Sequence, residues 1–491
     1  MPTRPRLAEE PTRRPVDRRW LALAVIAIAQ LMIALDATIV SIALPSAQHA
    51  LGASDAQRQW VITAYTLAFA GLLLVGGRIA DTFGRRRTFV VGLAGFALAS
   101  AVGGSAGTFA VLLAARAAQG AFAALLAPTA LSLLAVTFTQ PHERARAFAV
   151  YGAIAGSGAA IGLLLGGVLT QYFGWRWCLY VNVPIAVATA AGGWRVLSGN
   201  AGGHGQRLDL PGVAFATGGL VALVYGCTEA VSSGLSSGRV IGFLVASAML
   251  LSAFVLREAR TSAPLLPLRI VLDRNRGGAY LAAAFAIAGM FGAFLFLTYY
   301  LQVVLRYSPL QAGLAFLPLT LASQAGSWGI AGVLMPRVPA RWIMAPGALA
   351  AAAGMLILTQ IQVNSGYVTH VLPAEILLGI GIACVMAPAF NVGTRGVDPR
   401  QAGVAAATVN AATQIGASLG TALLNTIAAS ATAAYLIGRI PSSGSVNQAL
   451  VHGYAVAAAW AAGVLVLGAI TTALLIDAGP PARHVIEREA R

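Results

Sequence analysis

The sequence of 491 residues contains no lysine and little charge of either sign. Only 10% of its residues are charged, whereas soluble domains carry about 25%. Hydrophobic residues make up 58%, which excludes a water-soluble enzyme, a fibrous protein and a disordered chain and indicates an integral membrane protein. A Gly-x-x-x-x-Gly-Lys-Ser/Thr phosphate loop cannot exist without lysine, which argues against transport driven by ATP.

Cysteine and histidine are also scarce. The three cysteines lie in separate apolar stretches, so we expect neither a disulfide scaffold nor a metal site. The six histidines are scattered over separate loops and chain ends, whereas an enzyme needs its acids, bases or nucleophile gathered in one place. We therefore expect no enzymatic activity and no cofactor. An integral-membrane enzyme or a receptor is kept as a remote alternative.

Long apolar stretches are what the sequence has in abundance. A helix crosses the hydrocarbon layer in about 20 residues, and backbone groups cannot be left unpaired there. Fourteen stretches meet this requirement and are predicted to be membrane-spanning helices, numbered here as spans 1 to 14: 20–43, 59–77, 89–106, 109–136, 147–169, 178–197, 210–228, 239–256, 279–303, 311–334, 343–360, 369–392, 404–429 and 453–476.

The basic residues are all arginine, and the formal net charge is +16. Such a surplus can indicate nucleic acid, but the positions of the arginines favour a membrane explanation. With the N-terminus inside, 26 of the 32 lie in inner segments, five in outer loops and one, Arg116, inside a span. The positive-inside rule then predicts both termini in the cytoplasm, a cell-membrane location and no nucleic-acid partner. Residues 1–19 show no cleavable signal peptide and are interpreted as a cytoplasmic tail.

The two halves of the chain share a weak internal repeat. The motif Gly158-Ala-Ala-Ile-Gly162 in span 5 returns as Gly416-Ala-Ser-Leu-Gly420 in span 13, and Pro128 in span 4 returns as Pro388 in span 12. Transporters built from repeated bundles show symmetry of this kind. We therefore predict an all-α integral membrane protein with two pseudo-symmetric six-helix bundles and an inserted helix pair. The expected division is a tail (1–19), the N-terminal bundle (20–198), inserted helices 7 and 8 (199–257), the C-terminal bundle with its leading loop (258–476) and a second cytoplasmic tail (477–491).

Three ionisable residues interrupt the spans: Asp36 in span 1, Arg116 in span 4 and Glu375 in span 12. An ionisable group inside a membrane is costly and is therefore a candidate functional residue. At a rise of about 1.5 Å per residue, all three lie about 9 to 12 Å from the outer ends of their spans. The sequence thus places them at one level in the outer half of the membrane.

A buried carboxyl favours its neutral form, whereas a neighbouring guanidinium favours the charged form. A site whose access to water changes can therefore bind a proton on one side and release it on the other. We interpret Asp36 and Arg116 as a proton-coupling pair, and the alternative is a structural ion pair between spans 1 and 4. We interpret Glu375 as a second proton site or a ligand for a cationic substrate. The alternative is that Glu375 reaches the outer surface beside His370.

Glycines crowd span 5 and include Gly158, Gly162, Gly166 and Gly167. Small residues let helices approach closely and slide. This favours a helix that moves within a rocking bundle, although ordinary tight packing would show the same spacing.

The segment Gly77–Arg87, GRIADTFGRRR, resembles the loop signature of the major facilitator superfamily. Physically it is a glycine turn with one acid and an arginine cluster that can pair across the cytoplasmic gap between two bundles. The resemblance implies a gating loop after span 2, and its expected residues are Gly77, Arg78, Asp81, Gly84, Arg85 and Arg86.

Four further stretches narrow the resemblance to the fourteen-span drug:proton antiporters: Leu35–Pro45, Trp60–Tyr65, Arg116–Gly120 and Trp175–Pro184. The third is similar to the motif to which that family assigns a role in proton transfer. One position departs from the family pattern, because Leu163 stands where the fifth-span motif has proline. A missing proline removes a helix kink, which leaves open whether coupling is strict.

The resemblance implies two bundles around a central cavity that opens alternately to each side of the bilayer. A monomer would export amphipathic or cationic drugs or antibiotics in exchange for protons. The other function left open is a facilitator or metabolite transporter without proton coupling. Six residues are expected from their span positions to line the cavity, unless they face lipid or neighbouring helices: Gln119, Tyr299, Tyr300, Trp328, Phe390 and Asn410.

Overall fold

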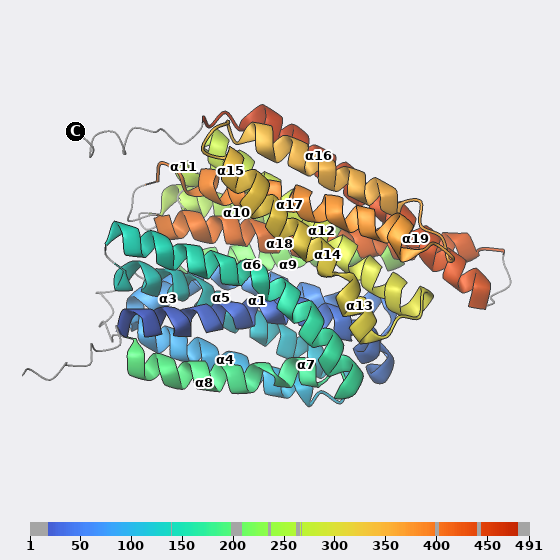
Figure 1. Ribbon diagram of the computed structural model, residues 1–491, viewed down its shortest axis with the longest axis horizontal. Coiled ribbons are helices and arrows are strands. Elements are labelled where there is room, and N and C mark those ends of the chain that lie inside the picture. The colour runs from blue at the N-terminus through green and yellow to red at the C-terminus, as the bar shows by residue number, and fades with distance from the viewer. Residues whose placement is uncertain are drawn as a thin grey trace, which may run out of the picture.

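A computed structural model of the chain describes residues 18–138, 140–197, 209–233, 237–261, 266, 268–397, 402–438 and 443–479. Secondary structure in these residues is helical throughout (Figure 1). Ten of the described helices are long and apolar enough to cross a membrane, and shorter apolar helices accompany them. Each of the fourteen predicted spans coincides with one helix or with a consecutive run of helices. The chain is therefore a multi-pass membrane protein of the predicted class.

The helices follow the order of the predicted spans. The first six spans are α1 (Arg18–Leu51), α3 (Trp60–Phe83), α4 (Arg85–Gly104), α5 (Phe109–Thr137), α6 (Pro141–Tyr172) and α8 (Asn182–Val196), with the short helices α2 (Asp55–Arg58) and α7 (Trp177–Tyr180) in their connections. The inserted pair is α9 (Leu210–Ser233) and α10 (Gly238–Arg260).

The last six spans contain more interruptions. They are α12 (Arg274–Tyr299) with the π-helical turn η1 (Tyr300–Val304), a broken run of α13 (Pro309–Ala315), α14 (Leu317–Ala325), η2 (Gly326–Ala331) and α15 (Gly332–Leu334), then α16 (Arg341–Leu358), η3 (Tyr367–Val371) with α17 (Leu372–Thr394), α18 (Ala402–Leu436) and α19 (Ser443–Leu475). The short α11 (Leu268–Val271) precedes α12.

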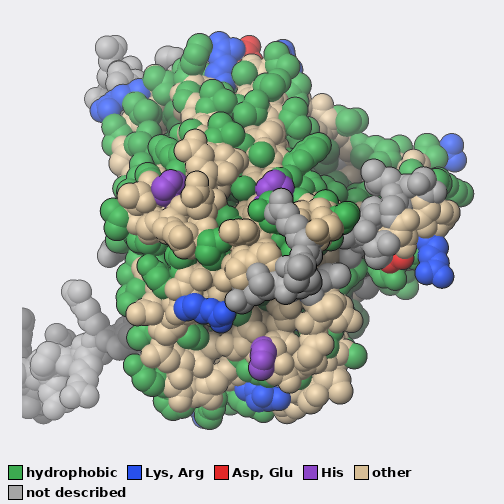
Figure 2. All heavy atoms as spheres, turned by 90° about the vertical axis from the view of Figure 1, so that its right-hand side faces the viewer, with side chains coloured by type: hydrophobic (Ala, Val, Ile, Leu, Met, Phe, Trp, Pro, Cys, Tyr) green, Lys and Arg blue, Asp and Glu red, His purple; other side chains and the backbone are tan. Residues whose placement is uncertain are grey.

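Two ends of the molecule are useful as reference points. We call the end at which α1 begins and α19 finishes the proximal end, and the opposite end, at which α1 finishes and α13 begins, the distal end (Figure 1). Figure 2 looks onto the distal end, where few arginine and acidic side chains are visible among apolar and uncharged polar ones.

The internal repeat is visible in the packing of both bundles. A Cβ atom on Gly162 of α6 would lie 2.8 Å from the carbonyl oxygen of Leu35 in α1, and one on Gly416 of α18 would lie 2.2 Å from that of Ala284 in α12. Real Cβ atoms do not come this close, so both helix pairs require glycine at the crossing. The fifth and first spans of each bundle therefore pack in the same way.

Helix starts at the distal end repeat as well. Ser54 caps α2 in a capping box with Gln57, and Ser308 caps α13 in a capping box with Gln311. In each box two backbone N–H groups at the helix N-terminus donate to the serine hydroxyl and the glutamine side-chain oxygen. The same Ser-x-x-Gln device therefore follows the first span of each bundle.

The inserted helix pair lies beside the two bundles. Helix α9 packs on α3 of the first bundle and on α18 of the second, and the Thr217 hydroxyl donates to the Gly71 carbonyl oxygen over 3.1 Å. Helix α10 packs mainly on α9 and exposes large apolar side chains such as Ile241, Met249 and Leu256. An apolar exposed face suits contact with lipid.

The two bundles meet closely at the distal end. A Cβ atom on Gly167 of α6 would lie 2.8 Å from the Pro309 carbonyl oxygen, and one on Gly313 of α13 would lie 2.6 Å from the Leu163 carbonyl oxygen. The Gln302 amide donates to the Ile42 carbonyl oxygen over 3.0 Å. Helix α13 of the second bundle is therefore docked directly on α6 of the first.

Arg58 adds a further contact at this end. Its guanidinium lies 3.9 Å above the ring of Tyr299, and its Nε donates to Asn425 Oδ1 of α18 over 3.2 Å. The Tyr299 hydroxyl donates to Gln48 at the end of α1. These contacts join α1 and α2 to α12 and α18.

Candidate functional site

Asp36 and Arg116 meet in the interior of the first bundle. Both side chains are buried, with exposed fractions of 0% and 1%, and Arg116 Nη1 lies 2.6 Å from Asp36 Oδ2. Asp36 comes from the middle of α1 and Arg116 from α5. The structure thus brings together the two residues that the depth argument placed at one level.

A shell of polar side chains completes this cluster. Gln119 Nε2 and Asn182 Nδ2 donate to Asp36 Oδ1 over 3.0 and 2.8 Å. Gln119 also donates to the Ser100 hydroxyl over 2.8 Å. Four helices, α1, α4, α5 and α8, therefore contribute to one hydrogen-bonded network around a single carboxylate.

The guanidinium of Arg116 has further partners. Its Nε donates to the Val61 carbonyl oxygen over 3.1 Å, and its Nη1 donates to Gln119 Oε1 over 2.9 Å. The group also lies 4.4 Å from the centre of the Tyr65 ring, a cation–π distance. Arg116 is thus held from α3 as well as from α1.

This donor set matches an ionised carboxylate. Asp36 accepts three hydrogen bonds, from one guanidinium and two amides. A protonated Asp36 would carry a hydrogen where one of these donors now lies, and it would no longer neutralise Arg116. Binding of a proton must therefore rearrange the cluster that joins α1 to α5 and α8.

Glu375 is also buried, with no exposed surface. The hydroxyl group of Tyr367 lies 3.1 Å from its Oε2, and Oε1 has no hydrogen-bond partner among the described residues. The alternative that Glu375 reaches the outer surface beside His370 is wrong, since the Glu375 side chain is fully buried and contacts Tyr367, while His370 Nδ1 contacts the Thr369 hydroxyl. Glu375 lies in the second bundle, apart from Asp36 and Arg116.

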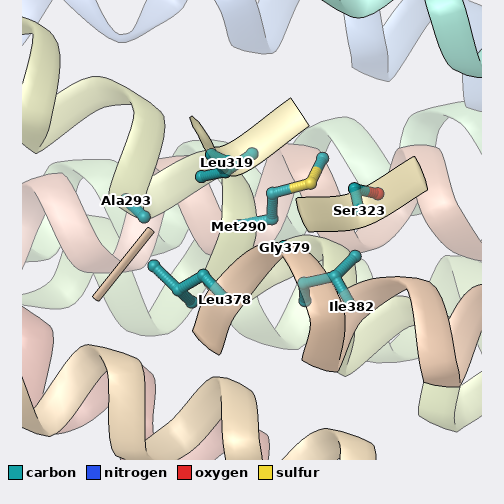
Figure 3. A pocket seen from close by; sticks show the side chains of 7 residues that line it. All are labelled: Met290, Ala293, Leu319, Ser323, Leu378, Gly379 and Ile382. Carbon is teal, nitrogen blue, oxygen red and sulfur yellow. The ribbon is translucent and has the colours of Figure 1, made fainter. Parts of the chain in front are cut away.

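A small apolar cavity lies close to Glu375. Seven residues from α12, α14 and α17 line it (Figure 3): Met290, Ala293, Leu319, Ser323, Leu378, Gly379 and Ile382. Leu378, Gly379 and Ile382 follow Glu375 by three, four and seven positions, so they share its face of α17. The cavity and the buried carboxyl therefore belong to one side of this helix.

The six residues expected to line the substrate cavity lie in separate surroundings. Gln119 belongs to the Asp36 network, Tyr299 lies beneath Arg58, and the Tyr300 hydroxyl donates to the Gln362 carbonyl oxygen over 2.8 Å. None of the six lines the cavity described above.

The other three of these residues are no closer to one site. Trp328 is 66% exposed, Phe390 packs at the edge of a cluster around Tyr280, and Asn410 donates to the Ala406 carbonyl oxygen of its own helix. The positions of these six residues along the spans therefore do not identify one substrate-binding cavity.

The predicted gating loop is mostly helical. Helix α3 continues through Gly77, Arg78 and Asp81 to Phe83, and α4 begins at Arg85, so Gly84 alone separates them. Gly84 has φ 93° and ψ 132°, in the region that favours glycine. The side chains of Arg78 and Asp81 lie outside the described part of the structure.

Arg86 turns toward its own bundle in this conformation. Its guanidinium lies 4.7 Å from the centre of the Trp194 ring, and its Nη1 donates to the Leu197 carbonyl oxygen over 3.5 Å. The expectation that the arginine cluster pairs across the gap between bundles is therefore not met by Arg86.

The glycines of span 5 make close helix contacts, as expected. A Cβ atom on Gly158 would lie 2.6 Å from Ala34, and one on Gly166 would lie 2.9 Å from the Ile39 carbonyl oxygen. Together with Gly162 they lay one face of α6 on α1, while Gly167 faces α13. Leu163, in the place of the motif proline, is buried in an unbroken helix.

Comparisons with known proteins agree with this architecture. Residues 26–421 match the profile described as Major Facilitator Superfamily. The chain is 53% identical over 465 residues to the puromycin resistance protein pur8 of Streptomyces alboniger, which covers 94% of this chain and 92% of that protein. It is 39% identical over 414 residues to the cephamycin export protein CmcT of Amycolatopsis lactamdurans, which covers 84% of this chain and 85% of that protein.

A solved structure shows the same fold. A bacterial homologue of the human lysosomal transporter Spinster, in an inward-facing and unoccupied conformation, matches with a TM-score of 0.68 at 18% identity. The match covers 94% of this chain and 97% of that chain.

Proposed function

Because the chain belongs to the Major Facilitator Superfamily, we propose that it is a proton-coupled exporter of amphipathic or cationic antibiotics. Membership in this family makes it a transporter of small molecules rather than an enzyme. The proposal adds the direction of transport, the class of substrate and the exchange for protons.

The proposed orientation follows from the arginines. With both termini in the cytoplasm, the proximal end faces inward and the distal end, where few charges are visible (Figure 2), faces outward, in line with the positive-inside rule. The docked α6 and α13 then close the outer side. The proposed units are the bundles 20–198 and 258–476 with the inserted segment 199–257, acting as a monomer in the cell membrane.

The ion pair between Asp36 and Arg116 carries the proposal. Both groups are buried in the interior of a membrane protein, where charges that serve no function are rare. A proton that binds to Asp36 cancels its charge and loosens the hydrogen bonds from Gln119 and Asn182, while Arg116 keeps its contacts with the Val61 carbonyl oxygen and Tyr65. Loss of the proton restores the network. Protonation therefore switches the attachment of α1 to α5 and α8.

The packing of α1 supplies a route from this switch to the bundle interface. Asp36 lies beside Leu35, whose backbone packs against Gly162, and Ile39 packs against Gly166 one turn later. Since α6 in turn carries α13, a shift of α1 reaches the contact between the two bundles. Binding of a proton can thus change which side of the membrane the cavity faces.

The proposed substrate class rests on the relatives. Proteins described as a puromycin resistance protein and a cephamycin export protein match most of the chain. Puromycin is therefore the first probe to test.

The test is efflux from vesicles that contain the purified protein. A proton gradient, acidic on the side that corresponds to the cell exterior, should drive puromycin toward that side, and collapse of the gradient should stop it. Asp36→Asn should abolish gradient-driven movement, whereas Asp477→Asn, which alters an exposed partner of Arg341, should leave it intact. Efflux that continues after both the proton gradient and the membrane potential are removed would contradict proton coupling.

The same assay distinguishes a proton-coupled exporter from the alternative of an uncoupled facilitator. That alternative is kept because Leu163 replaces the motif proline. A facilitator would carry puromycin down its own gradient at a rate that a proton gradient does not change.

A further inference from the structure

The single hydroxyl group of Tyr367 makes two short contacts. Its oxygen lies 2.6 Å from the Ala315 carbonyl oxygen and 3.1 Å from Glu375 Oε2. A carbonyl oxygen can only accept, so the shorter contact uses the one hydroxyl hydrogen. The longer contact is then a hydrogen bond only if Glu375 itself carries a proton and donates it to the tyrosine oxygen. This geometry fits a neutral Glu375.

The surroundings of Glu375 agree with a neutral carboxyl. The side chain is fully buried, and its Oε1 has no partner among the described residues. No ion pair of Glu375 occurs in the described part of the chain. A buried carboxylate without a cation is strongly disfavoured, so a proton is the simplest neutralising partner.

The helices packed around α17 bring no compensating charge to this level. Helix α14 contains no ionisable residue, α18 contains only Tyr435, and the arginines of α12 and α16 lie in their first turns at the proximal end. On the distal side η3 contributes Tyr367 and His370, and Tyr307 lies near Tyr367. Tyrosine hydroxyls stay neutral at physiological pH, and His370 is engaged with Thr369.

Tyr367 links this carboxyl to the interface between the bundles. The carbonyl that it contacts belongs to Ala315, the last residue of α13, directly before the break that separates α13 from α14. Helix α13 is the element docked on α6 through Gly313 and Gly167. The hydrogen bond therefore anchors the end of the docked helix to α17.

We propose that Glu375 is a second proton-binding site whose proton holds α13 docked against α6. When Glu375 loses its proton to water, the carboxylate accepts the Tyr367 hydroxyl hydrogen, and the Ala315 carbonyl oxygen loses its donor. Helix α13 is then released at its end, and the distal contact between the bundles weakens. The inference rests on the proposed proton-driven cycle and adds a proton site separate from Asp36.

The experiment measures the docking of α13 directly. Spin labels are placed on Tyr172→Cys in α6 and Leu314→Cys in α13, two exposed positions, in a chain whose native cysteines are replaced by alanine. Electron paramagnetic resonance gives the distribution of distances between the labels across a range of pH. In the otherwise unchanged chain, the short-distance population should fall as pH rises.

Variants assign the pH response to one carboxyl. The variants are made in an Asp36→Asn chain, so that the first proton site no longer responds to pH. In that chain Glu375→Gln cannot ionise and should keep the short distance at every pH, while Tyr367→Phe removes the link and should lower the short-distance population at every pH. Glu229→Gln, a matched change on α9, should retain the pH response in the same Asp36→Asn chain. A distance that does not change with pH, or that changes equally in Glu375→Gln, would overturn the inference.

Efflux measurements separate this inference from the proposed function. If the distance responds to pH through Glu375 but puromycin efflux ignores the proton gradient, the second proton site stands and the coupled cycle fails. If efflux is proton-driven but the distance does not respond, the second proton site alone is refuted.

Discussion

The ion pair between Asp36 and Arg116 can be tested as a thermodynamic unit. Three variants are needed: Asp36→Asn, Arg116→Gln and the double variant. Each single change leaves one charge buried without its partner, because the two side chains are 0% and 1% exposed. The double change removes both charges and keeps polar groups of similar size in the same space.

The structure sets the expected magnitudes. Removal of one partner of a buried ion pair lowers the free energy of unfolding by about 3–5 kcal/mol. The double variant loses hydrogen bonds of about 0.5–1.5 kcal/mol each but leaves no unpaired charge. We therefore expect its loss of stability to be smaller than the sum of the two single losses by about 2 kcal/mol or more, a non-additivity typical of residues in contact.

The assay has two readouts. Unfolding in mild detergent gives the stability of the four proteins, and puromycin efflux driven by a proton gradient gives their activity. If the pair couples protons, the double variant should be stable but should no longer respond to the gradient. Strictly additive losses of stability would refute the ion pair as a unit. A double variant that still exports in proportion to the gradient would show that the pair is only structural.

Three further predictions concern the helix contacts. Gly167→Ala places a methyl group 2.8 Å from a carbonyl oxygen of α13, so puromycin efflux should fall sharply. The control Gly463→Ala, whose methyl group would meet nothing within 4 Å, should leave the efflux rate unchanged. Equal efflux rates in the two variants would count against the docking of α13 on α6. Gly84→Ala forces alanine to φ 93° and ψ 132° and should lower the free energy of unfolding by about 1–3 kcal/mol. An unchanged free energy of unfolding would show that α3 and α4 are joined in another way. Arg58→Gln removes the cation–π contact with Tyr299 and should lower the free energy of unfolding by about 0.5–2 kcal/mol. An unchanged free energy of unfolding would show that the distal contact between the bundles does not depend on Arg58.

The fold could be predicted because the bilayer imposes long apolar stretches. Every predicted span coincides with helical structure, and the glycine motif in spans 5 and 13 marks equivalent crossings. The ends were less predictable, since helices such as α1 and α6 continue beyond the hydrocarbon layer, where hydropathy carries no signal. The breaks around Phe316 and Val181 depend on tertiary packing and are not visible in an apolar run.

The sequence predicts only part of the hydrogen-bonded cluster around Asp36. Asp36 and Arg116 stand out because ionisable residues in a span are rare, but Ser100, Asn182 and Tyr65 are common residue types whose role depends on which helices become neighbours. The loop expected after span 2 follows from the resemblance of Gly77–Arg87 to a family loop signature. Helix α3 nevertheless extends through Arg78 and Asp81, and the arginines from Arg85 onward begin α4, so only Gly84 interrupts the helical backbone.

Helix α9 has a consequence for how far the bundles can move. It rests on α3 and α18 at once, and Thr217 fastens it to the first of these. Helix α9 therefore spans both bundles on one flank of the transporter. When one bundle moves relative to the other, α9 must either slide along one of them or move together with one of them.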